Sequence, residues 1–476
     1  DYFLLIGPPG TGKTSRALRG MVEAFCREGK EILLLSYTNR AVDEICKMLA
    51  GITPAVDFIR IGSDVSCDEV YRPHLIENVL ESCATRLEVR ERMARCRIFV
   101  GTVSTLSAKT ELFRLKTFDV ALIDEATQIL EPQLLGLLCM RGVAGGDAIG
   151  KFILIGDHKQ LPAVVLQSAE QSEVADEALR AIGLRNLKDS LFERLYRNAA
   201  KRYGGGGSQG PASGSQSPAS GSQSPTSGSH GSASGSHGSA SGSQVSAPAL
   251  RSSVFAPFDM LCRQGRMNVE VAAFPNRAFY GGLLQPVGLE HQKGALRLAP
   301  ELAANEFAVV LTRRVAFLPS VPEPPMQSAK MNHSEAKIVA GLAAAVCRQY
   351  TLAGGGFNAA STLGIITPYR SQIALIRKEI AALGIAALND VLVDTVERFQ
   401  GSERDVIIYS FCVNRASQLR FLANLTEEDG VLIDRKLNVA LTRARKQMFI
   451  IGVPQLLRQN PIYARLLESC ESCGAV

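Results

Sequence analysis

The sequence lacks three features, and each absence narrows the class of protein. No apolar run reaches the ~18 residues that a transmembrane helix needs, although 46% of the 476 residues are hydrophobic, so we expect no membrane contact. No charged and then apolar leader is visible, so no targeting signal is predicted. Because the first residue is Asp rather than Met, we expect the chain to begin inside a longer polypeptide. The net charge of +6 permits nucleic-acid binding but does not argue for it.

A disulfide framework is also missing. The 11 cysteines are scattered, and several stand in apolar settings, as Cys139, Cys347 and Cys412 do, which is typical of reduced core thiols. Cys470-x-x-Cys473 has no second pair, so a metal site there is not favoured. These patterns predict a protein of the cytosol or the nucleus.

Residues 204–246 lack charge altogether. They contain no Lys, Arg, Asp or Glu, and a seven-residue unit repeats five times within them. The unit has no apolar positions with which to bury a core, so we predict a disordered linker over 204–248. Both a natural low-complexity tract and an engineered linker fit these residues.

The flanking regions have an α/β texture, in a chain long enough for two or three domains. Apolar strands alternate with amphipathic helices, which is typical of parallel sheets covered on both faces. We predict two lobes, 1–203 and 249–476, with a small helix-rich insertion at 47–97. The predicted strands are Tyr2–Ile6, Glu31–Ser36, Ile98–Thr102, Val120–Ile123 and Phe152–Ile155, then Ala308–Leu311, Leu363–Ile366, Val391–Asp394, Val406–Phe411 and Met448–Gly452.

A phosphate-binding loop follows the first predicted strand. Its residues are Gly7, Pro8, Pro9, Gly10, Thr11, Gly12, Lys13 and Thr14, which fit the pattern G-x-x-x-x-G-K-[ST]. The glycines let backbone N–H groups turn toward an anion, and the following helix adds its positive N-terminal end. We expect this loop to bind a nucleoside triphosphate, with Lys13 on the β/γ-phosphates and Thr14 on Mg²⁺.

Two carboxylates, Asp124 and Glu125, follow another predicted strand. At the carboxyl edge of a parallel sheet such a pair can hold Mg²⁺ and direct an attacking water. Asp124 is the predicted metal residue, and Glu125 is predicted to orient or deprotonate the water; a plain helix N-cap is the alternative. After the next strand, Gln160 can sense the γ-phosphate, whereas His158 is expected to face solvent.

Two arginines of the second lobe stand in unusual settings. Arg266 lies in Arg263-Gln264-Gly265-Arg266-Met267, and Arg443 follows an apolar helical stretch. An arginine from a second lobe can neutralise charge that develops on a transferred phosphoryl group. A surface salt bridge is the alternative for each.

Together these motifs resemble, in order, those of the superfamily 1 helicases. The nearest branch, of the AAA-domain type, is that of the nonsense-mediated-decay RNA helicase and its DNA-processing relatives. The resemblance covers nearly the whole chain apart from 47–97 and the linker. The motifs are Gly7–Thr14, Asp124–Gln128, Gly156–Leu161, Ser190–Leu195, Gln264–Met267, Gly364–Tyr369, Val396–Glu403 and Leu437–Arg445.

The resemblance implies two RecA-like lobes of the P-loop NTPase class, with ATP between them and a single strand of DNA or RNA crossing both. It makes Glu125, Gln160, Arg266 and Arg443 catalytic, and it places Glu403 near the ribose. The implied strand contacts are Thr38, Asn39, Thr102, Thr367 and Thr395, whose hydroxyls and amides suit phosphates and sugars. The implied function is that of an ATP-dependent helicase or translocase that moves 5′→3′. We expect a monomeric core, with protein partners on segments before Asp1.

Rival functions share part of this pattern. An ATP-driven clamp or ribonucleoprotein remodeller has the same sites but does not unwind processively. An oligomeric unfoldase shares only the phosphate loop, and an inactive scaffold is disfavoured because every catalytic position is intact. The motifs fit DNA and RNA equally.

The sequence departs from the family at three places. The family's adenine-reading Gln and an accessory β-domain lie upstream of the phosphate loop, outside this chain. Gly265 stands where the family usually has an aromatic residue that stacks on the base, and Asn268-Val269 replaces His-Pro. We therefore predict weak discrimination between bases, with Tyr369 and Arg370 as alternative adenine readers.

Overall fold

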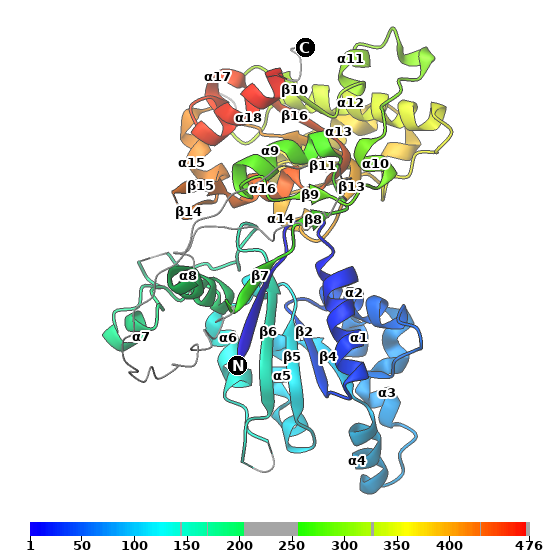
Figure 1. Cartoon of the computed structure of the whole chain (residues 1–476). Coiled ribbons are helices and arrows are strands. Elements are labelled where there is room, and N and C mark those ends of the chain that lie inside the picture. Colours follow the sequence, from blue (N-terminus) through cyan, green and yellow to red (C-terminus); the bar gives the residue numbers. More distant parts are fainter. Residues whose placement is uncertain (143–144, 169, 204–255, 325–327, 429, 473–476) are drawn as a thin grey trace, which may run out of the picture.

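The described residues form two lobes, each built on a parallel sheet (Figure 1). The structure is a computed structural model that describes residues 1–142, 145–168, 170–203, 256–324, 328–428 and 430–472. The predicted linker and Cys473 lie outside the described residues. Among the helices that are described, none has the length and apolar character needed to cross a membrane.

The first lobe contains a seven-stranded sheet in the order β3-β4-β2-β5-β6-β1-β7, and all its strand pairs are parallel. Alternate residues of each strand point to opposite faces, so each face has its own apolar cluster: α1 and α2 cover one, and α5, α6 and α8 cover the other. The strands are β1 (Tyr2–Ile6), β2 (Ile32–Ser36), β3 (Phe58–Ile61), β4 (Ile98–Thr102), β5 (Phe118–Ile123), β6 (Ile149–Gly156) and β7 (Phe258–Met260). The helices are α1 (Arg19–Arg27), α2 (Asn39–Ala50), α3 (Ile76–Leu80), α4 (Arg86–Arg95), α5 (Val103–Ala108), α6 (Glu131–Leu138), α7 (Glu177–Ala181) and α8 (Leu191–Tyr203).

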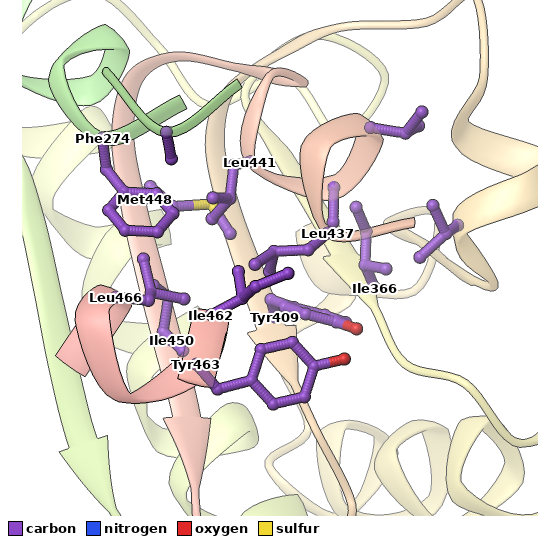
Figure 2. Close-up of a cluster of buried hydrophobic side chains, with 14 of the residues drawn as sticks. Phe274, Ile366, Tyr409, Leu437, Leu441, Met448, Ile450, Ile462, Tyr463 and Leu466 are labelled. Atoms are coloured by element: carbon purple, nitrogen blue, oxygen red, sulfur yellow. The ribbon is translucent and has the colours of Figure 1, made fainter. Parts of the chain in front are cut away.

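The second lobe contains a five-stranded parallel sheet in the order β10-β16-β13-β11-β12. Helices α12 and α13 cover one face, and α9, α16 and α18 cover the other. Figure 2 shows this second cluster, in which Phe274 of α9 and Leu441 of α16 lie beside Met448 of β16. The strands are β8 (Arg263–Gln264), β9 (Gln285–Pro286), β10 (Val315–Pro319), β11 (Leu363–Ile366), β12 (Leu392–Asp394), β13 (Arg404–Ser410), β14 (Leu425–Glu428), β15 (Val431–Asp434) and β16 (Ala444–Gly452). The helices are α9 (Val269–Phe279), α10 (Glu290–Lys293), α11 (Ala308–Leu311), α12 (His333–Leu352), α13 (Arg370–Ala382), α14 (Val396–Phe399), α15 (Leu419–Leu422), α16 (Arg435–Leu441), α17 (Pro454–Leu457) and α18 (Pro461–Ser472).

The structure adds two points to the predicted division of the chain. Residues 47–97, predicted as a small helix-rich insertion on the first lobe, complete α2 and provide the edge strand β3 as well as α3 and α4. Strand β7 follows the linker but pairs with β1, so it belongs to the first lobe (Figure 1). The chain therefore enters the second lobe only after Met260.

Two further local predictions were wrong. Ala308–Leu311 is not a strand but the helical turn α11, and the strand β10 follows it. Periodicity cannot separate a strand from a buried helical turn in so short an apolar run. Cys347 and Cys412 are buried as expected, whereas Cys139 is exposed because it ends α6.

Candidate active site

The predicted nucleotide-binding residues meet at one edge of the first sheet. The phosphate loop follows β1, and Gln160 follows the neighbouring strand β6. Asp124 and Glu125 follow β5, on the other side of β6. Since the strands are parallel, their carboxyl ends lie together. A cleft of about 390 Å³ opens there between the lobes. Its walls include Pro8–Thr14, Glu125, Gln160, Arg266, Glu403 and Arg443, and also Arg263, Gly265, Val287 and Leu289.

Glycines in the phosphate loop allow a conformation that other residues resist. Gly10 and Gly12 have φ angles of 74° and 78°, in the left-handed region that favours glycine. A Cβ on Gly7 would lie 2.1 Å from Cγ of Lys13, and a Cβ on Gly10 would lie 2.5 Å from Cβ of Arg266. The loop is therefore packed closely against its own lysine and against the second lobe.

Thr14 and Asp124 lie together, as the predicted magnesium site requires. The Thr14 hydroxyl donates to Oδ2 of Asp124 at 2.7 Å, and the backbone N–H of Glu125 donates to Oδ1 at 2.9 Å. Asp124 is buried; its burial and the Glu125 carboxylate raise its pKa. A hydroxyl and a carboxylate are hard oxygen ligands, so this pair fits Mg²⁺. The described residues contain no group of three His, Cys, Asp or Glu side chains that could hold a metal.

The second carboxylate, Glu125, is held in its charged form. Its backbone has φ 54° and ψ 36°, which is uncommon for a residue other than glycine. Its Oε1 lies 3.7 Å from Nζ of Lys13, and its Oε2 accepts a hydrogen bond from Gln128 at 2.9 Å. Burial acts to raise the pKa of Glu125, but Lys13, Gln128 and Arg443 together lower it.

Arg443 reaches this site from the second lobe. It follows α16 and is almost completely buried. Its Nη2 donates to Oε1 of Gln160 at 3.1 Å, and its Nε donates to the carbonyl of Val439 at 3.0 Å. Burial and the nearby Arg266 lower the pKa of Arg443 to about 9, so the guanidinium is charged at neutral pH. The two predicted catalytic residues Gln160 and Arg443 thus contact one another across the lobe interface.

Arg266 is paired with the predicted ribose residue. Its Nε lies 2.5 Å from Oε2 of Glu403, and its Nη1 donates to the carbonyl of Thr442 at 3.3 Å. Burial acts to raise the pKa of Glu403, but Arg266 lowers it. Asn268, which departs from the family pattern, caps α9 by accepting from the N–H of Glu270.

A buried hydrogen-bonded chain across the interface was not predicted from the sequence. Tyr280 donates from its hydroxyl to Oδ2 of Asp157 at 2.7 Å, and Asn438 donates to the Tyr280 hydroxyl at 2.8 Å. Asp157 also accepts from Nε2 of Gln160 at 2.7 Å. Asp157 and Asn438 lie within recognised motifs, but no local pattern marks Tyr280, which follows α9. These hydrogen bonds, which come from residues of both lobes, orient the Gln160 side chain.

His158 does not face solvent, contrary to the prediction. It is 2% exposed, its Nε2 lies 3.0 Å from Oε2 of Glu428 in the second lobe, and its ring stacks on Tyr196 at 4.3 Å. Helix α8 and the β14–β15 hairpin enclose the ring, and neither is adjacent to it in sequence. A second ion pair between the lobes joins Arg435 to Glu193 at 2.5 Å.

The residues predicted to contact a strand are divided between surface and interior. Thr38 and Asn39 are exposed where α2 begins, and Thr395 is half-buried before α14. Thr102 and Thr367 are only 4% and 0% exposed. Thr38 and Thr102 both use their hydroxyls to cap a helix. Burial therefore decides which side chains are open to a strand in this arrangement, namely those of Thr38, Asn39 and Thr395.

Comparison with known proteins agrees with the geometry. One AAA-domain model matches residues 250–455, and another matches 1–89 and 77–168. The DNA replication ATP-dependent helicase/nuclease DNA2 of Bos taurus is 26% identical over 97% of this chain and 36% of its own length. The corresponding helicase/nuclease JHS1 of Arabidopsis thaliana is 26% identical over 100% of this chain and 29% of its own length.

The chain thus spans about a third of the length of these relatives. A solved arterivirus nonstructural protein 10 helicase with DNA overlays with a TM-score of 0.40 and 12% identity, over 94% of this chain and 59% of its own. The family models together cover both lobes, and the phosphate loop, the acidic pair and the second-lobe arginines meet in one cleft. The chain belongs to the superfamily 1 helicases, in their DNA-processing branch.

Proposed function

We propose that this chain is the ATP-driven motor of a helicase that moves 5′→3′ along a single strand of DNA. The observation that carries the proposal is the hydrogen bond from Arg443 of the second lobe to Gln160 of the first. This bond joins the lobes beside the phosphate loop. Opening the cleft would therefore separate the predicted catalytic residues Arg443 and Gln160, and closing it would bring them together again. The names of the relatives favour DNA over RNA, and the direction rests on the family resemblance.

The proposed chemistry assigns one task to each group in the cleft. Lys13 and the loop N–H groups hold the phosphates, and Glu125 accepts the proton of the attacking water. Mg²⁺ held by Thr14 and Asp124 would neutralise phosphate charge. Arg266 and Arg443 oppose the charge that develops on the transferred group. Arg266 must first exchange Glu403 for a phosphate oxygen, which leaves the Glu403 carboxylate for the ribose.

Strand binding is proposed at the carboxyl edges of both sheets. Thr38 and Asn39 follow β2 in the first lobe, and Thr395 follows β12 in the second. A strand held at both edges by its phosphates and sugars changes its span when the lobes close, which couples hydrolysis to movement. The structure shows no disulfide among the cysteines of the described residues, and we therefore place the protein in a reducing compartment, the cytosol or the nucleus.

Two assays test the proposal. ATP hydrolysis is measured with and without matched single strands of DNA and RNA, with Lys13→Ala as the inactive control. Strand displacement is then measured on duplexes with a 5′ or a 3′ single-stranded tail. We expect stimulation by DNA and displacement from the 5′ tail alone. Stimulation without displacement would instead indicate a clamp or remodeller, and ATP hydrolysis indifferent to both strands would refute a nucleic-acid motor.

A further inference from the structure

We propose that the base of the bound nucleotide rests on an aliphatic platform formed by Val287 and Leu289, and that this platform accepts all four bases. The proposal rests on the proposed function, because it concerns the nucleotide that the same cleft binds. It names a class of substrate, nucleoside triphosphates in general, and two residues that no motif of the chain includes.

The cleft has a phosphate end and a nucleoside end. Lys13, Glu125 and Arg443 mark the phosphate end, where the predicted chemistry takes place. The triphosphate fills the loop, so the nucleoside must lie against the remaining walls. Those walls are Ser15, Arg16, Arg263, Gly265, Val287, Leu289, Gly401 and Glu403. Apart from methylene stems, the apolar surface there comes from Val287 and Leu289.

Gly265 keeps this apolar surface open. A Cβ on Gly265 would lie 3.5 Å from Cδ1 of Leu289 and 3.6 Å from Cγ2 of Val287, at ordinary contact distance. A larger side chain at 265 would therefore extend over both residues. With glycine there, their methyl groups remain accessible, and Leu289 is 43% exposed. The N–H of Gly265 donates to the carbonyl of Gly10 at 2.8 Å, which fixes the platform to the phosphate loop.

The nucleoside end has little with which to distinguish one base from another. Among the residues that the structure describes, no aromatic side chain lines the cleft, and the one side-chain amide there, Gln160, is held at the phosphate end by Arg443 and Asp157. Glu403, which Arg266 holds in this structure, is assigned to the ribose once Arg266 turns to the phosphates, and the ribose is the same in every nucleotide. The methyl groups of the platform and the exposed Arg263 guanidinium would contact the flat face of the base. Because every base has such a face, these contacts do not favour one base over another. Discrimination arises when a buried polar group is left unpaired by the wrong substrate, and this end offers no such group.

Tyr369, an alternative adenine reader raised from the sequence, lies away from the nucleoside end of the cleft. It does not line the cleft, and its hydroxyl accepts a hydrogen bond from Nε2 of Gln418 at 3.2 Å. Arg370 begins α13 and does not line the cleft either.

The test compares ATP, GTP, CTP and UTP as substrates of the full chain with saturating single-stranded DNA. We expect kcat/KM values within about tenfold of one another. Leu289→Ala should raise KM for all four by a similar factor of about threefold or more and leave kcat nearly unchanged. Leu283→Ala is the matched control, because Leu283 is 55% exposed near β9 but does not line the cleft. Its KM values should equal those of the parent.

Gly265→Tyr tests the same geometry by adding an aromatic ring over the platform. The backbone at 265 does not have a positive φ, so tyrosine fits it, and its ring would cover the platform. KM for ATP and GTP should then fall about fivefold or more, because stacking is stronger for purines, while the values for CTP and UTP change little. A parent that prefers ATP more than a hundredfold, or Leu289→Ala with unchanged KM for every nucleotide, would overturn the proposal. Binding of mant-ATP and mant-GTP without DNA separates this result from a failure of the motor function, because it requires no strand.

Discussion

Replacing Glu335 by Gln tests how one buried carboxylate limits the stability of the second lobe. Glu335 lies in the first turn of α12 and is fully buried. Its Oε2 accepts hydrogen bonds from the Ser410 hydroxyl at 2.6 Å and from the N–H of Cys412 at 2.9 Å, and the Ser320 hydroxyl donates to Oε1 at 3.3 Å. Burial raises the pKa of Glu335 to about 7, and these hydrogen bonds only partly oppose it.

The direction and size of the effect follow from this pKa. The folded protein holds the proton more tightly than the unfolded chain, whose glutamate has a pKa of about 4.5. The free energy of unfolding therefore falls as the pH rises from about 4.5 to about 7, and it stays low above that range. At ~1.4 kcal/mol for each pKa unit, the loss amounts to ~3 kcal/mol.

Glutamine retains the shape and hydrogen bonds without a proton to lose, since its amide nitrogen can donate to Ser320. Glu335→Gln should match the parent at pH 4.5 and exceed it at pH 8 by ~3 kcal/mol, which is roughly 6–12 °C in Tm for a lobe of this size. Thermal unfolding is followed by far-ultraviolet circular dichroism because the chain has no Trp. Glu301→Gln, at an exposed carboxylate, is the control. A Tm difference that does not change with pH would refute the reasoning.

Three other outcomes are expected. Glu125→Gln should still bind ATP but hydrolyse it at least ~100-fold more slowly, and near-normal turnover would exclude Glu125 as the base. Arg266→Ala and Arg443→Ala should each lower kcat by ~10³ with little change in mant-ATP affinity, whereas equal losses in both would mean a structural role. Arg435→Met and Glu193→Gln should show a coupling of at least ~0.5 kcal/mol in a double-mutant cycle on DNA-stimulated kcat, because their ion pair is only 11% exposed on each side. Additive effects would mean that this pair does not act during turnover.

Much of the fold could be predicted because its strands are continuous apolar runs. Three strands, β1, β4 and β11, begin and end at the predicted residues. The site could be predicted for a related reason. Lys13, Glu125 and Gln160 of the first lobe lie in the segments that come after such strands, and parallel strands bring their carboxyl ends to one edge.

Other elements left no local signal. Strand β7 has only three residues, and its partner β1 lies about 250 residues earlier in the sequence. Their pairing is therefore seen only in the folded sheet. The edge strand β3 was obscured by the charged helices that follow it. The exposed Cys139 and the buried His158 show the same limit, because a residue type sets a tendency toward burial while its neighbours in space decide the outcome.

The sequence by itself determined the chemistry at the phosphate end, because phosphate binding and metal binding depend on residue types at fixed spacing within one segment. Only the tertiary structure decided which groups meet between the lobes. Arg443 contacts Gln160 and Tyr280 contacts Asp157 across 283 and 123 residues of chain. Such contacts follow no period along the sequence, because they arise only when two separately folded sheets place their carboxyl edges face to face. The proposed platform of Val287 and Leu289 could be inferred only from the folded chain for the same reason, since the fold places both residues in the cleft beside Gly265.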